Sequence, residues 1–217
     1  MGKYMTIYES VNAELIEKKS RFISNIFYIE DASQAEDIIK GIRKKYYDAK
    51  HVCYAYSFIK KNDVINKSSD DGEPSGTAGA PILNLIIKNN LKNILIIVVR
   101  YFGGILLGTG GLVKAYTLSS QLALENAKLV EEEEGKEVYI EVNYKEFDKF
   151  KYFCKKQNIT IDKIEYEKNI NIILYANESD IQTILDNKDE KSIKVEKIEV
   201  GKSCKIRKNV DIIINIK

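Results

Sequence analysis

Two glycine-rich stretches on either side of a short apolar run constrain this chain more than any other feature. The first is DDGEPSGTAGAP at residues 70–81, and the second is RYFGGILLGTGGLVKAY at residues 100–116. Eight of the twelve glycines and both prolines of the chain lie between Asp70 and Tyr116. Glycine permits positive φ angles and lets another molecule approach the backbone amides closely. We therefore expect the functional surface to lie in this part of the chain.

The composition predicts a globular, cytoplasmic protein. A chain of 217 residues with 44% apolar and 30% charged residues can bury a core and is not disordered. The longest apolar runs, such as Ile94–Val99, are too short to span a bilayer, and the N-terminal residues lack the apolar core of a signal peptide. Three widely spaced cysteines indicate reduced thiols rather than disulfides or a zinc site. We expect no membrane partner and no cofactor.

The sequence EEEEG at residues 131–135 is the one clear candidate for a domain boundary. Adjacent like charges repel one another and favour solvent, and a glycine follows them. The pattern predicts a helix end followed by a solvated hinge. We accordingly place one domain at residues 1–133 and a second at residues 136–217.

The first domain is predicted to be mixed α/β. Its strongest signals are a helix that opens with the capping box Ser33–Glu36, and an unbroken β-branched run at Ile94–Val99 that is typical of a buried strand. The other expected elements are an edge strand at Arg21–Ile29, strands at His51–Ile59 and Val64–Ser68, a short helix with Pro81 in its first turn, and a helix at Leu112–Leu129.

The second domain has a simpler predicted order. We expect strands at Val138–Tyr144, Ile159–Tyr166, Ile170–Tyr175 and Ile193–Val200, with helices at Lys145–Gln157 and from Ser179 onward. This βαββαβ order is that of the ferredoxin-like split βαβ arrangement. Asp211–Ile216 is a candidate additional edge strand. The fold class is therefore α+β, in two domains.

The second glycine-rich stretch has the features of an anion site. A buried strand that passes through glycines into a helix start leaves free amides at the positive end of the helix dipole. Arg100, Thr109 and Lys114 could add side-chain contacts to a phosphate. The spacings GxxxxGK[ST] and GxGxxG are absent, so neither nucleotide hydrolysis nor dinucleotide binding is indicated. Tight strand–helix packing would explain the same glycines equally well.

The first glycine-rich stretch places three carboxylates, Asp70, Asp71 and Glu73, around a turn. Such a group could hold Mg²⁺, which prefers oxygen ligands, but a turn leading into Pro74 is the more common explanation. We therefore predict no metal. Ser75 and Thr77 follow, yet the nucleophile motif GxSxG is absent.

Two further groups carry possible chemistry. His51 is the only histidine, and strand alternation places it on the same face as Cys53; a packed histidine is more common than a general base. Residues 201–208 contain four cations and no acid, so this segment could contact nucleic acid, although a solvated strand end is the more common reading. These cations are Lys202, Lys205, Arg207 and Lys208.

Three motifs resemble the signature of the IMPACT/YigZ family. They are DAKHVCYAY at residues 48–56, SDDGEPSGTAGAPIL at 69–83 and VVRYFGGILLGTGGLVKAY at 98–116, and the resemblance covers roughly residues 15–120. It implies a βαβ first domain like ribosomal-protein and GHMP-kinase modules. It also implies a ferredoxin-like second domain similar to a C-terminal domain of elongation factor G.

Carried over residue by residue, the resemblance implies one shared ligand-binding surface. Its members are His51, Asp70, Asp71, Glu73, Ser75, Thr77, Arg100, Tyr101, Gly103, Gly104, Gly108, Gly110, Gly111 and Tyr116. The chain departs from the family at Lys50 and Val52, at Leu106, where a lysine is frequent, and at Lys114, where an arginine is frequent. The loss of a basic residue at position 106 weakens the case for strong phosphate binding.

The resemblance also implies a role in translation, because eukaryotic relatives act in translational control by binding a regulator of a stress kinase. We expect a translation-associated or RNA-binding regulatory protein without catalytic activity, whose partner is RNA, the ribosome or a protein. Two alternatives remain open. One is a hydrolase with an acidic site at Asp70, Asp71 and Glu73, and the other is a protein-binding module with Tyr101 and Phe102 as anchors.

Overall fold

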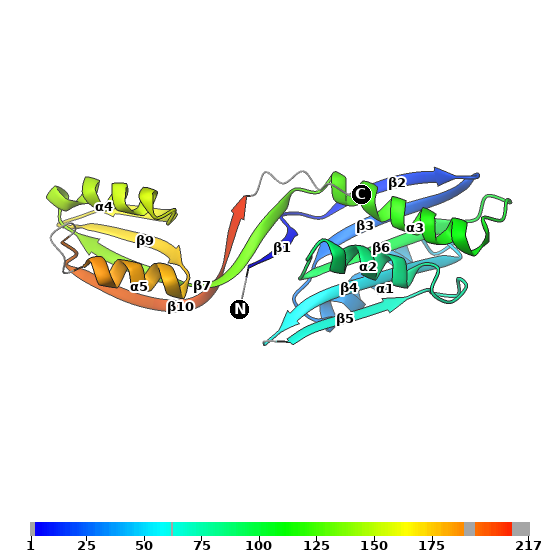
Figure 1. Ribbon diagram of the computed structural model, residues 1–217, viewed down its shortest axis with the longest axis horizontal. Helices are drawn as coiled ribbons and strands as arrows, with labels where there is room; N and C mark the ends of the chain where they lie inside the picture. The colour runs from blue at the N-terminus through cyan, green and yellow to red at the C-terminus, as the bar shows by residue number, and fades with distance from the viewer. Residues whose placement is uncertain (1–2, 62, 189–193, 210–217) are drawn as a thin grey trace. The chain divides into compact units, whose positions relative to one another are not determined.

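The computed structural model describes residues 3–61, 63–188 and 194–209, and these form two compact units. The first unit comprises Tyr4–Glu131 and the second comprises Glu132–Lys208 (Figure 1). Both mix helices with strands, so the predicted two-domain α+β class is confirmed. The additional strand predicted at Asp211–Ile216 lies outside the described residues.

The first unit is built on a five-stranded sheet of order β2-β3-β6-β4-β5. All neighbouring strands in it are antiparallel. The strands are β2 (Val11–Glu17), β3 (Ser20–Tyr28), β4 (His51–Lys60), β5 (Asp63–Ser69) and β6 (Ile94–Tyr101). A short strand, β1 (Tyr4–Ile7), is hydrogen-bonded beside β7 (Leu129–Val142) in the other sheet.

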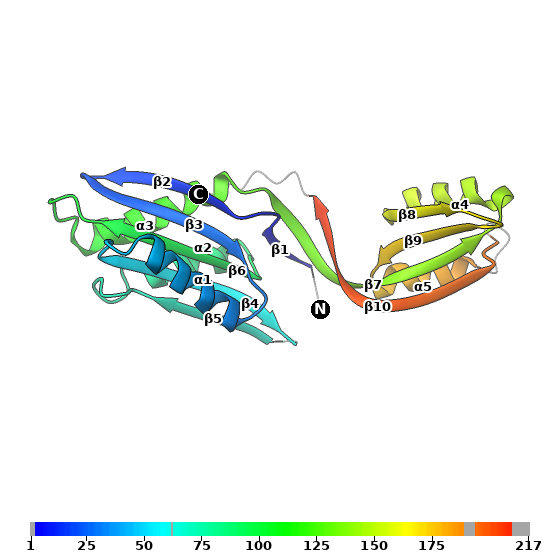
Figure 2. The same cartoon turned by 180° about the vertical axis from the view of Figure 1, so that it is seen from behind.

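Helices cover both faces of this sheet. Helix α1 (Ala32–Lys45) lies on one face, and α2 (Gly79–Lys88) and α3 (Gly108–Glu125) lie on the other (Figures 1 and 2). Strand β6 contributes alternate side chains to the two cores, and Ile94–Val99 is fully buried, as its β-branched run predicts. The predicted alternation of β4 is also confirmed, since Cys53 faces α2 and α3 while Val52 faces α1.

The second unit has the predicted ferredoxin-like order. Its sheet runs β10-β7-β9-β8, and α4 and α5 pack with the strands in one apolar core. The elements after β7 are α4 (Tyr144–Lys156), β8 (Ile161–Tyr166), β9 (Ile170–Ala176), α5 (Glu178–Asn187) and β10 (Lys197–Asn209).

The acidic run is the clearest difference from the prediction. Residues 131–134 lie inside β7 rather than at a helix end or in a solvated hinge, and the side chains of Glu132 and Glu133 are buried. Strand β10 supplies the compensating charges: Arg207 Nε lies 2.7 Å from Glu132 Oε2, and Lys208 Nζ lies 3.6 Å from Glu133 Oε1. Cations that lie more than seventy residues away in sequence offset the repulsion expected from the local pattern.

Other differences concern edges and helix ends. Strand β3 is interior rather than an edge strand, because β2, which was not predicted, pairs with it. Asp31 caps α1 in place of Ser33, and Asn177 caps α5 in place of Ser179. Each of these capping side chains lies two residues before the predicted one and accepts a hydrogen bond from a backbone N–H in the first turn. Helix α3 begins at Gly108 and ends at Glu125, four residues before the predicted range at each end.

Candidate functional site

The acidic loop, Asp70–Ala78, joins β5 to α2 and begins with a carboxylate that organises it. Asp70 Oδ1 accepts hydrogen bonds from the backbone N–H groups of Ala78 (2.9 Å) and Gly79 (2.8 Å), and Oδ2 accepts one from Gly76 (2.8 Å). Burial raises the pKa of Asp70, but the three hydrogen-bond donors together lower it by more. The net pKa therefore lies below the ordinary value. Asp70 therefore holds the loop closed and satisfies the amides that precede α2.

Asp71 ties the same loop to α1. Arg43 donates from both terminal nitrogens, at 2.9 and 2.5 Å, and the N–H of Val52 donates to Asp71 Oδ2 at 2.7 Å. Burial raises the pKa of Asp71, and the stronger effect of Arg43 and Val52 brings it below the ordinary value. Asp71 adopts a positive φ of 45°, and Gly72 continues the turn at 83°. Sequence reasoning missed Arg43, because nothing in the local helical pattern marks one surface arginine among several cations.

Glu73 forms the buried centre of the site. Its Oε1 accepts hydrogen bonds from Arg100 Nη1 (2.6 Å) and Tyr116 Oη (2.9 Å), and His51 Nε2 lies 3.9 Å away. The side chains of Glu73 and Arg100 are only 3% and 7% exposed. Antiparallel pairing of β4 with β6 places His51 directly opposite Arg100, and α3 supplies Tyr116. The loop, two strands and a helix thus converge on one carboxylate.

His51 and Cys53 also anchor the acidic loop. His51 Nδ1 lies 2.9 Å from the carbonyl oxygen of Asp71, which only accepts, so Nδ1 carries the proton of this hydrogen bond. Cys53 Sγ lies 2.9 Å from the carbonyl oxygen of Asp70 and 3.3 Å from Tyr116 Oη. Burial raises the pKa of the Cys53 thiol to about 12, so at neutral pH it is a packed thiol rather than a nucleophile.

The apolar loop, Phe102–Leu107, joins β6 to α3 and rests on the β2–β3 turn. The N–H of Gly103 donates to Ser20 Oγ at 3.2 Å. A Cβ atom at Gly103 would lie 2.0 Å from the carbonyl carbon of Lys19, so only glycine permits this approach of two backbones. Gly104 has a positive φ of 84°. The loop conformation is therefore fixed by its contact with the turn.

The apolar loop presents large side chains to solvent. Phe102 and Ile105 are exposed, and Leu106 is 83% exposed. Helix α3 follows without a side-chain cap, and its first residues, Gly108 to Gly110, are exposed. Three adjacent apolar residues between glycines, Ile105–Leu107, are a signal that sequence reasoning could have used for a contact surface.

Most of the sequence-predicted site residues of the first unit fall into two groups. His51, Asp70, Asp71, Glu73, Arg100 and Tyr116 meet around the acidic loop, whereas Gly104, Gly108, Thr109, Gly110, Gly111 and Lys114 belong to the apolar loop and the first two turns of α3. Arg100 belongs to the interior rather than to the start of α3: it pairs with Glu73 and lies near the Phe22 and Phe102 rings. The Arg100 side chain is thus largely buried rather than presented at the surface.

Three predicted residues have more local roles. Ser75 is exposed at the acidic loop, and Thr77 Oγ1 donates to the carbonyl oxygen of Pro74 at 2.6 Å. Tyr101 donates to Asp48 at 2.7 Å, and this hydrogen bond raises its pKa to about 12. The half-buried Tyr101 is thus engaged within the chain, which leaves Phe102 as the more exposed of the two predicted anchors.

The basic segment lies in β10, where much of its charge is balanced. Lys205 and Arg207 pair with Glu132, and Lys208 pairs with Glu133. Lys202 is exposed. Ion pairing with buried carboxylates leaves less positive charge for phosphates than the sequence of residues 201–208 indicates.

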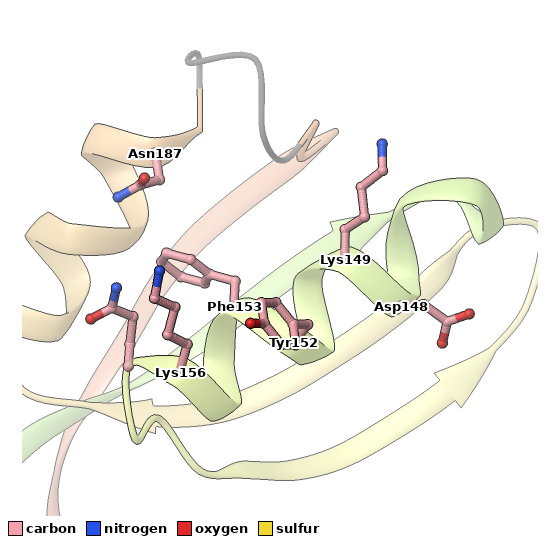
Figure 3. Close-up of a pocket in the computed structure, with 7 residues that line it drawn as sticks. Asp148, Lys149, Tyr152, Phe153, Lys156 and Asn187 are labelled. Atoms are coloured by element: carbon pink, nitrogen blue, oxygen red, sulfur yellow. The ribbon is translucent and has the colours of Figure 1, made fainter.

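A cavity in the second unit is lined by none of the predicted site residues. It has a volume of about 540 Å³ and is lined largely by α4, with Asn187 from the end of α5 (Figure 3). Its lining residues are Asp148, Lys149, Tyr152, Phe153, Lys156, Gln157 and Asn187. Across the described part of the chain, no three His, Cys, Asp or Glu side chains are grouped as a metal site requires. Nor does any described helix have the length and apolarity needed to cross a membrane.

Comparison with known proteins agrees with this architecture. The Impact N-terminal domain family matches residues 18–124, and a domain of unknown function, DUF1949, matches residues 140–186. The IMPACT family member YvyE of Bacillus subtilis is 35% identical over 180 residues, which are 83% of this chain and 82% of that protein. An IMPACT family member of Haemophilus influenzae is 35% identical over 208 residues, or 93% of this chain and 100% of that protein.

A solved structure extends the likeness to the whole fold. The crystal structure of a hypothetical protein matches with a TM-score of 0.59 and 25% identity, over 93% of this chain and 98% of that one. Each of the two family matches falls in one of the two structural units. The two bacterial relatives align over most of this chain and over most of their own length. The chain is therefore a member of the IMPACT family.

Proposed function

We propose that this protein acts in translational control in the cytoplasm, and that it does so by binding a protein partner through the apolar loop. Membership of the IMPACT family supports the first part, because the family resemblance implies translational control for eukaryotic relatives. The observation that carries the second part is Leu106, which stands 83% exposed on a loop fixed by the contact of Gly103 with Lys19. Exposed apolar side chains on a fixed backbone bind at a low cost in conformational entropy.

The internal contacts of the acidic loop favour binding over hydrolysis. Asp70 accepts from three backbone amides, Asp71 pairs with Arg43, and Glu73 pairs with Arg100. A general acid or base must reach a substrate atom within hydrogen-bonding distance. These carboxylates are instead occupied by groups of the same chain, and they shape the surface rather than act on a substrate.

Nucleic-acid binding is the second candidate, and one observation favours it. The N–H groups in the first turn of α3 have no side-chain cap, and Lys114 is exposed one turn further along. Such amides attract anions. We favour protein binding because the exposed apolar side chains of Phe102, Ile105 and Leu106 make no favourable contact with phosphates. In addition, the cations of β10 that could bind phosphates are paired with Glu132 and Glu133.

The test compares Leu106→Asp with Tyr47→Asp, because Tyr47 has a matched exposure of 86% in the turn after α1. Each purified protein is immobilised, incubated with lysate and washed at low and high salt, with and without RNase. We expect the wild type and Tyr47→Asp to retain the same translation-related protein after RNase treatment. Leu106→Asp should lose it by about thirtyfold, the effect of a binding hot spot of about 2 kcal/mol.

A cell-free translation reporter provides the functional readout. Added wild-type protein and Tyr47→Asp should change reporter synthesis equally, and Leu106→Asp should not change it. The alternative outcome is recovery of RNA that is lost after RNase treatment, falls steeply with salt and is unchanged in Leu106→Asp. That result would instead establish nucleic-acid binding. A reporter that responds equally to all three proteins would remove the apolar loop from the account.

A further inference from the structure

Strand β5 forms one free edge of the first sheet. It stands last in the order β2-β3-β6-β4-β5, and among the strands of the described residues it pairs with β4 alone (Figure 1). Residues 63–68 are all exposed, including the apolar Val64 and Ile65. A strand in this position presents a row of backbone N–H and C=O groups that can pair with another strand. The edge is therefore exposed along residues 63–68 of β5.

The side chains of β5 alternate in a regular way. The register with β4 places Ile65 opposite Phe58 and Lys67 opposite Tyr56, on the face of the sheet that α1 covers. Asp63, Ile65 and Lys67 share this face, because successive side chains of a strand point to opposite sides. Within the described part of the chain, neither Asp63 nor Lys67 has an ion-pair partner. An anion and a cation thus lie at equal distances on either side of Ile65.

We propose that β5 pairs antiparallel with β5 of a second copy of this chain, about a two-fold axis through Ile65. Ile65 then lies opposite Ile65 of the other copy, and Asp63 lies opposite Lys67 at both ends of the contact. Directly opposed side chains in an antiparallel pair lie on the same face, so two ion pairs flank the apolar contact. The two five-stranded sheets join into one continuous sheet across an isologous interface.

The sequence DVINK at residues 63–67 favours this register over the two registers that are centred on Val64 or Asn66. A two-fold axis through Val64 would place Asp63 opposite Ile65, and an axis through Asn66 would place Ile65 opposite Lys67. Both alternatives lose both ion pairs and the contact between isoleucines. Only pairing centred on Ile65 matches charge with charge and apolar with apolar side chains, and this self-complementarity identifies a second copy as the occupant of the edge.

A charge-swap cycle tests the proposal by sedimentation equilibrium of the full chain. Wild-type protein is expected to show a reversible monomer–dimer equilibrium. Lys67→Asp and Asp63→Lys should each weaken it by about tenfold, because both ion pairs become like-charge pairs. The double variant Asp63→Lys/Lys67→Asp carries the wild-type net charge and restores both pairs, so it should dimerise as the wild type does. Both positions of the cycle, 63 and 67, are solvent-exposed, so all three variants should retain the fold.

Cross-linking tests the register itself. In a Cys204→Ser background, Cys53 and Cys154 remain buried, and a new cysteine is placed at Ile65 or, as the matched control, at Val64. Diamide should oxidise two Ile65→Cys thiols to a disulfide-linked dimer, because the two copies of this position face each other. Val64→Cys faces Asn66 and should remain unlinked. Any of three results would overturn the proposal. The chain could stay monomeric at every soluble concentration, it could dimerise equally in all the charge variants, or Ile65→Cys and Val64→Cys could form disulfide-linked dimers to the same extent.

Discussion

The acidic loop and the apolar loop are both rich in glycine and both lead into a helix, yet they are used in opposite ways. In the acidic loop Asp70, Asp71 and Glu73 accept hydrogen bonds from α1, β4, α2, β6 and α3. In the apolar loop Gly103 packs on Lys19, while Phe102, Ile105 and Leu106 stand in solvent. The first loop directs its polar groups inward, and the second directs its apolar groups outward.

Under the proposed function, this difference assigns stability to one loop and recognition to the other within the first unit. Polar groups that are buried with good partners fix a backbone, whereas exposed apolar groups are free to contact another molecule. Substitutions in the acidic loop should therefore lower the free energy of unfolding. Substitutions of exposed side chains in the apolar loop should leave it unchanged and act on binding.

The largest effect on stability is expected from Glu73→Ala. The change leaves the buried guanidinium of Arg100 without its carboxylate, and breaking one side of a buried ion pair costs about 3–5 kcal/mol. Urea unfolding measures this loss. Glu73→Gln keeps the volume and one hydrogen-bond acceptor, so its loss should be smaller. An unfolding free energy for Glu73→Ala within about 1 kcal/mol of wild type would show that the centre of the acidic loop is not structural.

Gly103→Ala should have the next largest effect. The added Cβ would lie 2.0 Å from the carbonyl carbon of Lys19, so the two backbones must separate, at a cost of about 1–3 kcal/mol. Gly110→Ala is the matched control, because no atom lies within 4 Å of its Cβ position in α3. That control should gain up to about 1 kcal/mol from helix propensity. Thermal unfolding of both variants measures the contrast, and equal effects would contradict the close approach at Gly103.

The acidic loop should also give stability a pH dependence through Asp70. Its pKa in the folded protein lies below the ordinary value, so the stabilisation is complete above the unfolded-state pKa, about 4, and is lost as the pH falls toward the folded value. Asp70→Asn should lower the free energy of unfolding by about 1–2 kcal/mol at neutral pH. It should also reduce the loss of stability that the wild type shows as the pH falls below about 4. Unfolding measured from pH 7 to acid checks both. A wild-type curve with no acid limb, or one that Asp70→Asn leaves unchanged, would exclude this role.

The smallest effect on stability is expected in the apolar loop. Leu106→Asp and Tyr47→Asp change side chains that are 83% and 86% exposed, so both should unfold within about 0.5 kcal/mol of wild type. Urea unfolding of the preparations used for partner recovery checks this expectation. A large loss of stability in Leu106→Asp alone would mean that the apolar loop supports the fold, and its effect on binding could no longer be assigned to a contact.

Local patterns predicted much of the fold. The β-branched run of β6, the alternation of β4 and the βαββαβ order of the second unit depend on residues close in sequence, and all three are confirmed. The acidic run was assigned wrongly because Arg207 and Lys208, which neutralise it, lie far along the chain in β10. A residue type alone does not say which way a side chain points or which distant group it meets.

The same limit applies to the candidate site. The motifs pointed to the acidic and apolar loops as the candidate site, which stays a prediction. The inward direction of Arg100 depends on Glu73, which becomes its neighbour only when the acidic loop closes over β4 and β6. Arg43 was missed because its partner, Asp71, lies 28 residues away on another element. Exposure of Leu106 likewise follows from the packing of Gly103 against Lys19, which no local pattern shows.

Native-state amide hydrogen exchange tests the contrast between the two loops most directly. The N–H groups of Gly76, Ala78 and Gly79 donate to Asp70, so they should exchange slowly, at rates set by large-scale opening of the first unit. Those of Gly108, Thr109 and Gly110 occupy the uncapped first turn of α3 and should exchange fast. Exchange that is equally fast in both sets, or slower at the start of α3 than in the acidic loop, would contradict the account.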